Sequence, residues 1–297
     1  MKLETAKKVI KLASRISVLA ILFLVIDMLI SRHAFAWGPG VHTVIALRSL
    51  DAASGFLSGI GSVILSNPLE YLYGSLAADF FLMKRHLKST RHAHHWKGGF
   101  ALLEQATADK EKAYAYGFLA HLAADVVAHN VFIPTLANIF PNKRRGTHLA
   151  WEIRADYAVG PMYTSIAKEV LVTDQKACDD ILRSVTSKRK NGLKTRKKIY
   201  TQSVKISDYL YGAVPNLFTG TTFRWEGFKE YTLRIVSVSF LFVCEFLQDP
   251  YHSLCLKYDP NGKGRLGRLR SRGLLARVLR PKRPYPSMPG GGPIYRI

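Results

Sequence analysis

Apolar residues recur every three or four positions along most of the chain, which is the spacing that one face of an α-helix requires. Alternating patterns typical of β-strands are scarce, and no internal repeat is evident. Helix-length stretches of this kind cover residues 44–53, 112–132, 149–159, 165–172, 177–185 and 231–247. The pattern therefore predicts an all-α domain.

Three segments depart from this helical pattern. Residues 187–198, SKRKNGLKTRKK, have no apolar periodicity, so we expect a solvated basic loop. Residues 257–297 are rich in Gly, Pro and Arg, a composition that buries too little apolar surface to fold, so we expect a disordered tail. With a leader over residues 1–36, the predicted all-helical domain covers residues 37–256.

The leader has the three parts of a secretory signal. Basic side chains precede an apolar run over residues 16–30, and Ala34 and Ala36 supply small residues at the −3 and −1 positions. The run is shorter than the ~20 residues of a spanning helix, and it contains Asp27. We therefore expect cleavage after Ala36 and a secreted or periplasmic protein that begins at Trp37. The alternative is a membrane anchor that stays uncleaved.

Net charge adds information because it is unevenly distributed. Of the +22 carried by 297 residues, residues 1–36 hold +4, residues 188–198 hold +7 and residues 251–297 hold +10, which leaves +1 for the rest. A nearly neutral body argues against a nucleic-acid-binding domain with a basic folded surface. The basic tail suits the anionic phosphates of either a membrane or a nucleic acid, or simple exposure to solvent.

Histidines and carboxylates at helical spacing form the main candidate site. His121, Asp125 and His129 are four residues apart in an apolar stretch, so they share one helical face. His148 and Glu152 repeat the same step in THLAWEIRAD. Burying such groups is costly unless something neutralises them. Because the three cysteines are too few and too scattered for a thiolate site, the spacing favours zinc bound by imidazole nitrogen and carboxylate oxygen.

Further candidates precede that helix, and each is weak alone. Asp79 closes the apolar stretch YGSLAADFF, a histidine cluster occupies RHAHHW, and His42 follows Trp37 by five residues. A histidine-rich loop is often only solvated, and an Asp after alanines often marks a helix end. The full ordered series of candidates is Trp37, His42, Asp79, His94, His121, Asp125, His129, His148 and Glu152.

This ordered series resembles the zinc-dependent phospholipase C family, whose members are all-helical and bind up to three zinc ions. The resemblance implies that the free amino group and carbonyl of Trp37 bind one ion together with His42. It implies that Asp125 bridges this ion to a second. The ligands that complete the second ion would be Asp79, His94 and His121, and those of the third would be His129, His148 and Glu152.

Two details of the resemblance concern individual residues. Asp79 is implied to orient or deprotonate the attacking water. His94 is preferred to His92 and His95 because a ligand histidine of the family stands two residues before an aromatic, here Trp96.

The resemblance implies a secreted zinc-dependent phosphodiester hydrolase that cleaves phospholipid head groups, with the basic tail binding the membrane surface. Fungal-type single-strand nucleases are similar in scaffold and also begin at Trp, but their last ligand is usually Asp, where this chain has Glu152. That difference favours the phospholipase. A non-catalytic, zinc-stabilised membrane-surface protein is the remaining alternative.

Overall fold

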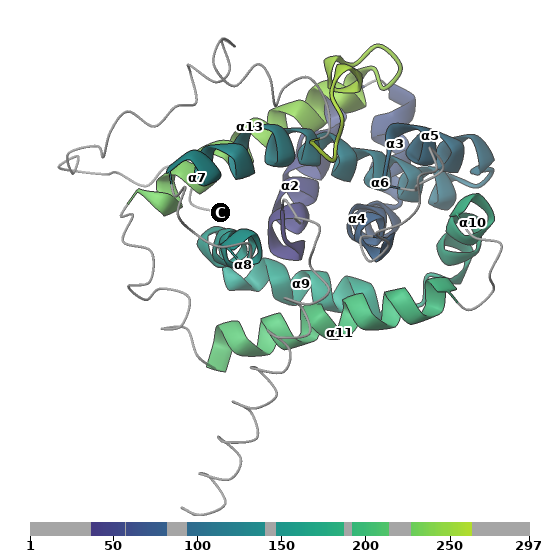
Figure 1. The fold of residues 1–297 in the computed structure, drawn as a ribbon. Helices are drawn as coiled ribbons and strands as arrows, with labels where there is room; N and C mark the ends of the chain where they lie inside the picture. Colours follow the sequence, from purple (N-terminus) through teal and green to yellow (C-terminus); the bar gives the residue numbers. More distant parts are fainter. Residues whose placement is uncertain are drawn as a thin grey trace, which may run out of the picture.

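In the computed structural model, which describes residues 37–56, 58–81, 94–139, 147–186, 192–213 and 227–262, the regular elements are all helices (Figure 1). The α-helices are α2 (Pro39–Asp51), α3 (Ser58–Ser66), α4 (Pro68–Ala77), α5 (Trp96–Gln105), α6 (Asp109–Val127), α7 (Ile133–Ile139), α8 (Thr147–Val159), α9 (Pro161–Val172), α10 (Lys176–Thr186), α11 (Gly192–Ala213) and α13 (Phe228–Gln248). These residues contain no strand, so the all-α prediction is confirmed. The six stretches with helical periodicity fall in α2, α6, α8, α9, α10 and α13.

The basic segment 187–198 is only partly a loop, because α11 already begins at Gly192. Leu193, Tyr200 and Val204 are buried along one face of this helix, at spacings of seven and four residues. The charged side chains between them hid this pattern in the sequence. The prediction of a loop over residues 192–198 was therefore wrong.

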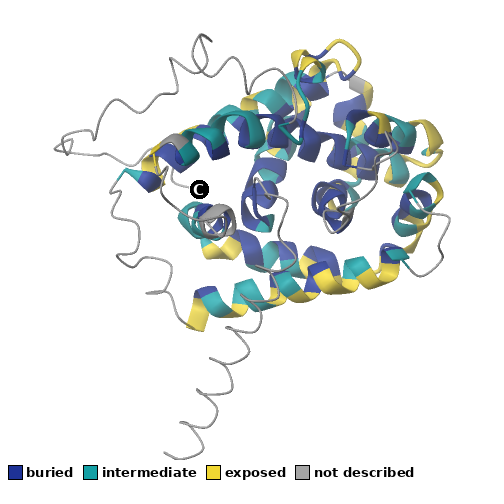
Figure 2. Ribbon diagram, viewed as in Figure 1, coloured by how far each residue is buried: buried dark blue, intermediate teal, exposed yellow. Residues whose placement is uncertain are grey.

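Helix α2 lies in the middle of the bundle and packs against α4, α6, α8, α9 and α13. Figure 1 shows α6 and α13 along one side of it, and α9 and α11 along the other. Buried residues concentrate in α2, α4 and α6, whereas α11 exposes its outer face (Figure 2). The N-terminal end of the described chain thus enters the core directly, with Trp37 only 1% exposed.

Two glycines bring α4 and α6 into backbone contact. A Cβ atom at Gly74 would lie 2.0 Å from the Tyr114 carbonyl oxygen, and one at Gly117 would lie 2.0 Å from that of Tyr71. No side chain fits at either position. Because α4 leads into the short 3₁₀ turn Ala78–Phe81 and α6 carries the central candidate ligands, this contact sets the distance between Asp79 and those ligands.

The run Asp109–Ala137 joins α6 to α7 through a π-helical turn, Ala128–Phe132. By length and composition this run could span a membrane, but 72% of its most apolar window is buried inside the fold. That degree of burial is typical of a core helix.

The folded chain continues beyond the predicted boundary at residue 256. A 3₁₀ turn spans Leu254–Lys257, and the Trp96 indole Nε1 donates a 2.8 Å hydrogen bond to the Tyr258 carbonyl oxygen. Residues up to Gly262 therefore pack on the domain rather than belonging to a disordered tail. The leader and the predicted tail from residue 263 onward lie outside the described residues.

The α4–α6 contact gives a testable prediction. Gly117→Ala should lower the free energy of unfolding by roughly 1–3 kcal/mol, because the added methyl group meets backbone that cannot rotate away. Gly59→Ala is the matched control: it is also helical, but its Cβ would meet nothing within 4 Å, and alanine there should be neutral or stabilising by up to ~1 kcal/mol. Urea unfolding of both variants measures the difference. Equal stabilities would contradict the proposed contact.

Candidate metal centre

Five polar side chains from four parts of the chain meet in the core. His42 comes from α2, Asp79 from the turn after α4, and His94 from the residues just before α5, while His121 and Asp125 lie one turn apart on α6. Each is at most 5% exposed. Burial of this many titratable groups together requires mutual compensation or a bound cation.

Asp125 is the centre of this cluster. Its Oδ1 lies 3.4 Å from His42 Nε2, and its Oδ2 lies 3.1 Å from His94 Nε2 and 3.3 Å from His121 Nε2. Burial alone would raise the pKa of the Asp125 carboxyl. The surrounding imidazoles outweigh that effect and hold the pKa well below its usual range, so Asp125 is a carboxylate.

Asp79 is the second carboxyl group of the cluster. Its Oδ1 lies 3.4 Å from His121 Nε2, while its Oδ2 accepts a 3.2 Å hydrogen bond from the Tyr200 hydroxyl of α11. Burial raises the pKa of Asp79 to about 6, and the charge of His121 partly opposes that rise. Asp79 can therefore exchange a proton near neutral pH, which Asp125 cannot.

Hydrogen bonds at the far side of two imidazole rings fix which nitrogen carries the proton. His121 Nδ1 lies 2.7 Å from the Ser75 carbonyl oxygen, which can only accept, so this nitrogen is the donor. His94 Nδ1 lies 3.1 Å from the amide oxygen of Asn261, which also only accepts. In the neutral rings the lone pairs are therefore on the Nε2 atoms, which face each other at 3.0 Å.

Facing lone pairs repel unless a cation lies between them. In metal-free protein a proton on His94 can take the place of that cation. The hydrogen bond to Asp125 and the charge of Asp125 outweigh the effect of burial and raise the pKa of His94. Burial and the neighbouring His42 lower the pKa of His121. A metal ion would satisfy both lone pairs and Asp125 together.

The donor set fits zinc. Neither ring nitrogen of His42 has a hydrogen-bond partner, although the ring is buried and stacks on His121 with centroids 3.8 Å apart. Ligand atoms within 4.8 Å of one another form two groups, His42 with Asp79 and His121, and His94 with His121 and Asp125. The two groups share His121. Imidazole nitrogen and carboxylate oxygen are ordinary zinc ligands, and the three ligands of either group are fewer than the four that zinc usually takes.

The remaining predicted site residues are less close to Asp125 or less completely described. His129 Nε2 lies 3.9 Å from Asp125 Oδ2, and burial lowers the pKa of this imidazole to about 4, so the ring is neutral and able to bind a metal. Glu152 is buried on α8. His148 belongs to the first turn of α8, but its side chain lies outside the described residues.

Trp37 is fixed in the core by its ring. The indole Nε1 donates a 3.1 Å hydrogen bond to Ser239 Oγ, and the ring packs on Phe132 with centroids 4.3 Å apart. Of the histidines around His94, His95 instead caps α5, where its Nδ1 accepts from the Lys97 amide at 3.4 Å. His92 lies outside the described residues.

Asp156 is a buried acid that the sequence analysis missed. Its two carboxylate oxygens accept from the amides of Gly40 at 3.1 Å and Val41 at 2.8 Å, so it caps the first turn of α2 immediately before His42. Burial raises its pKa to about 7, although both amides lower it. The signal was present, because Asp156 follows Glu152 by four residues and shares its face of α8.

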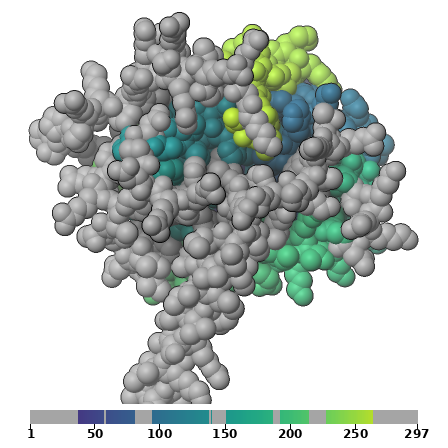
Figure 3. Space-filling model, viewed as in Figure 1, coloured from purple at the N-terminus to yellow at the C-terminus, as the bar shows by residue number. Residues whose placement is uncertain are grey.

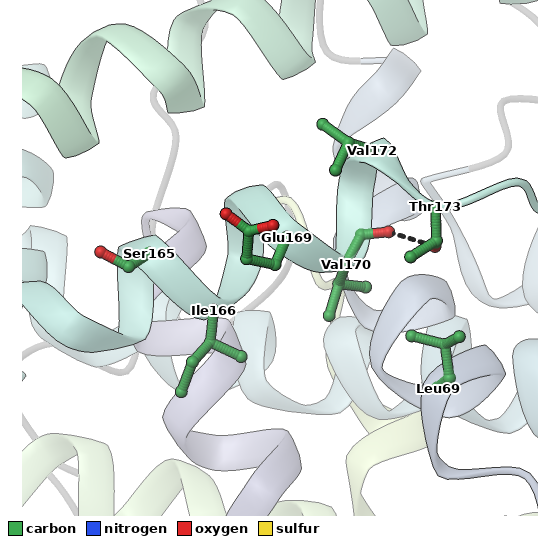
Figure 4. A pocket seen from close by; sticks show the side chains of 7 residues that line it. All are labelled: Leu69, Ser165, Ile166, Glu169, Val170, Val172 and Thr173. Atoms are coloured by element: carbon green, nitrogen blue, oxygen red, sulfur yellow. Dashed lines mark hydrogen bonds between the residues drawn. The ribbon is translucent and has the colours of Figure 1, made fainter.

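A separate surface pocket contains none of these residues. It is lined by Leu69, Ser165, Ile166, Glu169, Val170, Val172 and Thr173, mostly from α9 (Figure 4). In Figure 4 the Thr173 hydroxyl is bonded back to the Val170 carbonyl oxygen, so it is already satisfied. This pocket is mostly apolar, and Glu169 supplies the one carboxylate among these lining residues.

Comparison with known proteins agrees with this chemistry. A family model described as zinc-dependent phospholipase C matches residues 41–205, which include every candidate ligand except Trp37. The chain belongs to this family of zinc-dependent, all-helical proteins. No curated protein and no solved structure matches the chain.

Removing one ligand should test the metal centre. His121→Ala should release zinc and lower the melting temperature, because its removal leaves Asp79 and Asp125 buried with less compensation. His252→Ala is the matched control, since that histidine is 84% exposed in its side chain and pairs with Asp249. Elemental analysis of both purified variants gives the zinc content. Equal zinc in the two variants would contradict a metal site at His121.

Proposed function

We propose that this protein is a zinc-dependent phosphodiester hydrolase that cleaves phospholipid head groups by phospholipase C-type chemistry. The observation that carries the proposal is the convergence of three Nε2 atoms on the two carboxylate oxygens of Asp125, inside a chain of the zinc-dependent phospholipase C family. When bound in such a site, zinc neutralises phosphate oxygens and makes water acidic enough to attack at neutral pH.

The proposed ligand set extends the described cluster. His42, Asp79, His94, His121 and Asp125 would hold two ions, with Asp125 bridging, because its two oxygens face different histidines. A third ion would use His129, His148 and Glu152. The amino group and carbonyl of Trp37 would join His42 once the leader is removed after Ala36.

Asp79 is the proposed proton acceptor. Its pKa of about 6 is close to the range in which a general base works well, and Tyr200 holds one of its oxygens in place. The other oxygen points toward His121 and stays within the cluster. Asp79 would therefore orient the attacking water and take its proton, while Asp125 stays ionised as a ligand.

The protein is proposed to act outside the cytoplasm, at a membrane surface. Residues 263–297 carry ten basic side chains and no acidic one. Each Lys or Arg near an anionic bilayer contributes about 1 kcal/mol to binding. This segment would attach the enzyme to anionic lipid, while the cluster in the nearly neutral domain performs the chemistry.

Substitution of Asp79 tests the proposed activity. Asp79→Asn should lower zinc-dependent release of phosphorylated head groups from phospholipid vesicles by about 10²-fold or more, because it removes the proton acceptor, while most of the zinc remains. Asp249→Asn is the matched control: its carboxylate is exposed and pairs with His252. Head-group release and zinc content are measured on the same preparations.

The same proteins should be assayed on single-stranded DNA and RNA. Cleavage of nucleic acid without head-group release would replace the phospholipase proposal by a nuclease. Zinc-loaded, leader-cleaved protein that acts on neither substrate would indicate a non-catalytic zinc protein. Full activity of Asp79→Asn on vesicles would remove the role proposed for Asp79.

Deletion of residues 263–297 tests the membrane role separately. The truncated protein should bind anionic vesicles more weakly than the full-length chain, because the ten charges are lost. The difference should be largest at low salt, since at 0.1 M salt the attraction of the tail is screened over a Debye length of ~10 Å. Hydrolysis of a soluble short-chain phospholipid should stay nearly unchanged, because the cluster is intact. Vesicle co-sedimentation across a salt series measures the first effect. Unaltered binding would show that the tail does not attach the enzyme to lipid.

A further inference from the structure

Residues beyond the part of the chain that matches the family reach the metal centre. The segment Tyr258–Gly262, which we call the C-terminal strap, follows α13 and the 3₁₀ turn. The family match ends at residue 205. Figure 3 shows this end of the described chain, in yellow-green, on the surface over the blue atoms of the earlier helices. The strap therefore lies outside the part of the chain that the family model matches.

We propose that Asn261 of the strap is a positioning residue that fixes the tautomer and orientation of His94 for metal binding. Its amide oxygen Oδ1 lies 3.1 Å from His94 Nδ1, and its amide nitrogen Nδ2 donates a 2.8 Å hydrogen bond to the His94 carbonyl oxygen. One side chain thus contacts both the ring and the backbone of the same ligand. This inference rests on the metal site of the proposed function and not on the identity of the substrate.

The orientation of the Asn261 amide follows from its partners. Nδ2 lies near the His94 carbonyl oxygen and, at 3.3 Å, near Asp259 Oδ1, and both of these are acceptors. The nitrogen must therefore be on that side, and the oxygen must face His94 Nδ1. Since this oxygen only accepts, Nδ1 carries the proton of the neutral ring, which leaves the Nε2 lone pair available to a metal ion beside Asp125. That is the tautomer in which His94 binds a metal through Nε2.

The strap is held by residues adjacent to candidate ligands. Trp96, two residues after His94, donates to the Tyr258 carbonyl oxygen, and Asn130, next to His129, donates to the Asp259 carbonyl oxygen at 3.0 Å. The Asp259 carboxylate in turn accepts from the backbone N–H of Asn261 at 2.8 Å. The strap therefore links the start of α5 to the π-helical turn, with Asn261 between them.

Gly262 completes the link to His129. Its φ of +69° favours glycine, and a Cβ there would lie 3.0 Å from the His129 carbonyl oxygen and 3.2 Å from the His129 Cβ. The backbone of the strap thus lies directly against the turn that carries this histidine. Asn261 is held at a fixed place relative to both His94 and His129.

Two substitutions separate positioning from simple folding. Asn261→Leu introduces a side chain of similar size that cannot form a hydrogen bond to the His94 ring. It should weaken zinc affinity by about 10- to 100-fold. Asn261→Asp keeps an acceptor for Nδ1 but loses the donor to the His94 carbonyl oxygen and meets the Asp259 carboxylate, so it should lose some affinity but clearly less than Asn261→Leu. Asn67→Leu is the matched control: among the described residues, the Asn67 side-chain nitrogen donates to the Val63 carbonyl oxygen of α3.

Zinc affinity is measured by competition with a chelator on the full-length chain and on each variant. In parallel, the ¹⁵N shifts of the His94 ring, measured in metal-free protein at a pH high enough to make this ring neutral, report its tautomer, a property that a purely structural role would leave unchanged. We expect one tautomer, protonated at Nδ1, in the wild type and in Asn261→Asp, and a mixture in Asn261→Leu.

Three results would overturn the proposal. The first is wild-type zinc affinity in Asn261→Leu, and the second is the same single tautomer of His94 in that variant. The third is an equal loss of zinc affinity in Asn261→Leu and Asn261→Asp, because the strap would then be a folding element only. Absence of zinc binding by the wild type would instead overturn the metal site itself. If the wild-type protein binds zinc but does not hydrolyse lipid, the proposed function fails, while the role of Asn261 at the metal site stands.

Discussion

The buried carboxylate of Asp125 is the constraint on which the rest of the structure depends. Three imidazole Nε2 atoms surround it within 3.4 Å, and His129 Nε2 follows at 3.9 Å. The lone pairs of His94 and His121 are directed at each other by acceptors behind their rings. Such an arrangement is costly in the core of a protein unless a cation is shared among the ligands.

The helices around Asp125 are arranged to hold its neighbours at fixed distances. Gly74 and Gly117 allow α4 and α6 to touch through their backbones, which brings the turn with Asp79 beside His121. Asp156 reaches from α8 to cap the first turn of α2, one residue before His42. The ligand geometry is therefore a consequence of helix packing, because no single helix carries more than a part of the site.

The supporting contacts divide the cluster into groups with different chemistry. Histidines keep Asp125 ionised, whereas Asp79, with Tyr200 on one oxygen, has a pKa of about 6. Two carboxylates close together thus differ in their ability to take a proton. The C-terminal strap adds a contact behind His94, so an element beyond the family match helps to define the site.

The sequence by itself determined the helical class of the fold, because apolar periodicity is a local property of a helix. Four-residue steps indicated His121 and Asp125, whereas His42, Asp79 and His94 entered only through the ordered series that resembles the family. The sequence could not reveal Asn261, which is 167 positions from His94, or Tyr200, which is 121 positions from Asp79, because only folding brings such residues together. It also placed residues 192–198 in a loop, since their charges masked the buried face that begins at Leu193. The tertiary structure decided which nitrogens face Asp125, because the acceptors that orient the rings come from Ser75 and Asn261, in other parts of the chain.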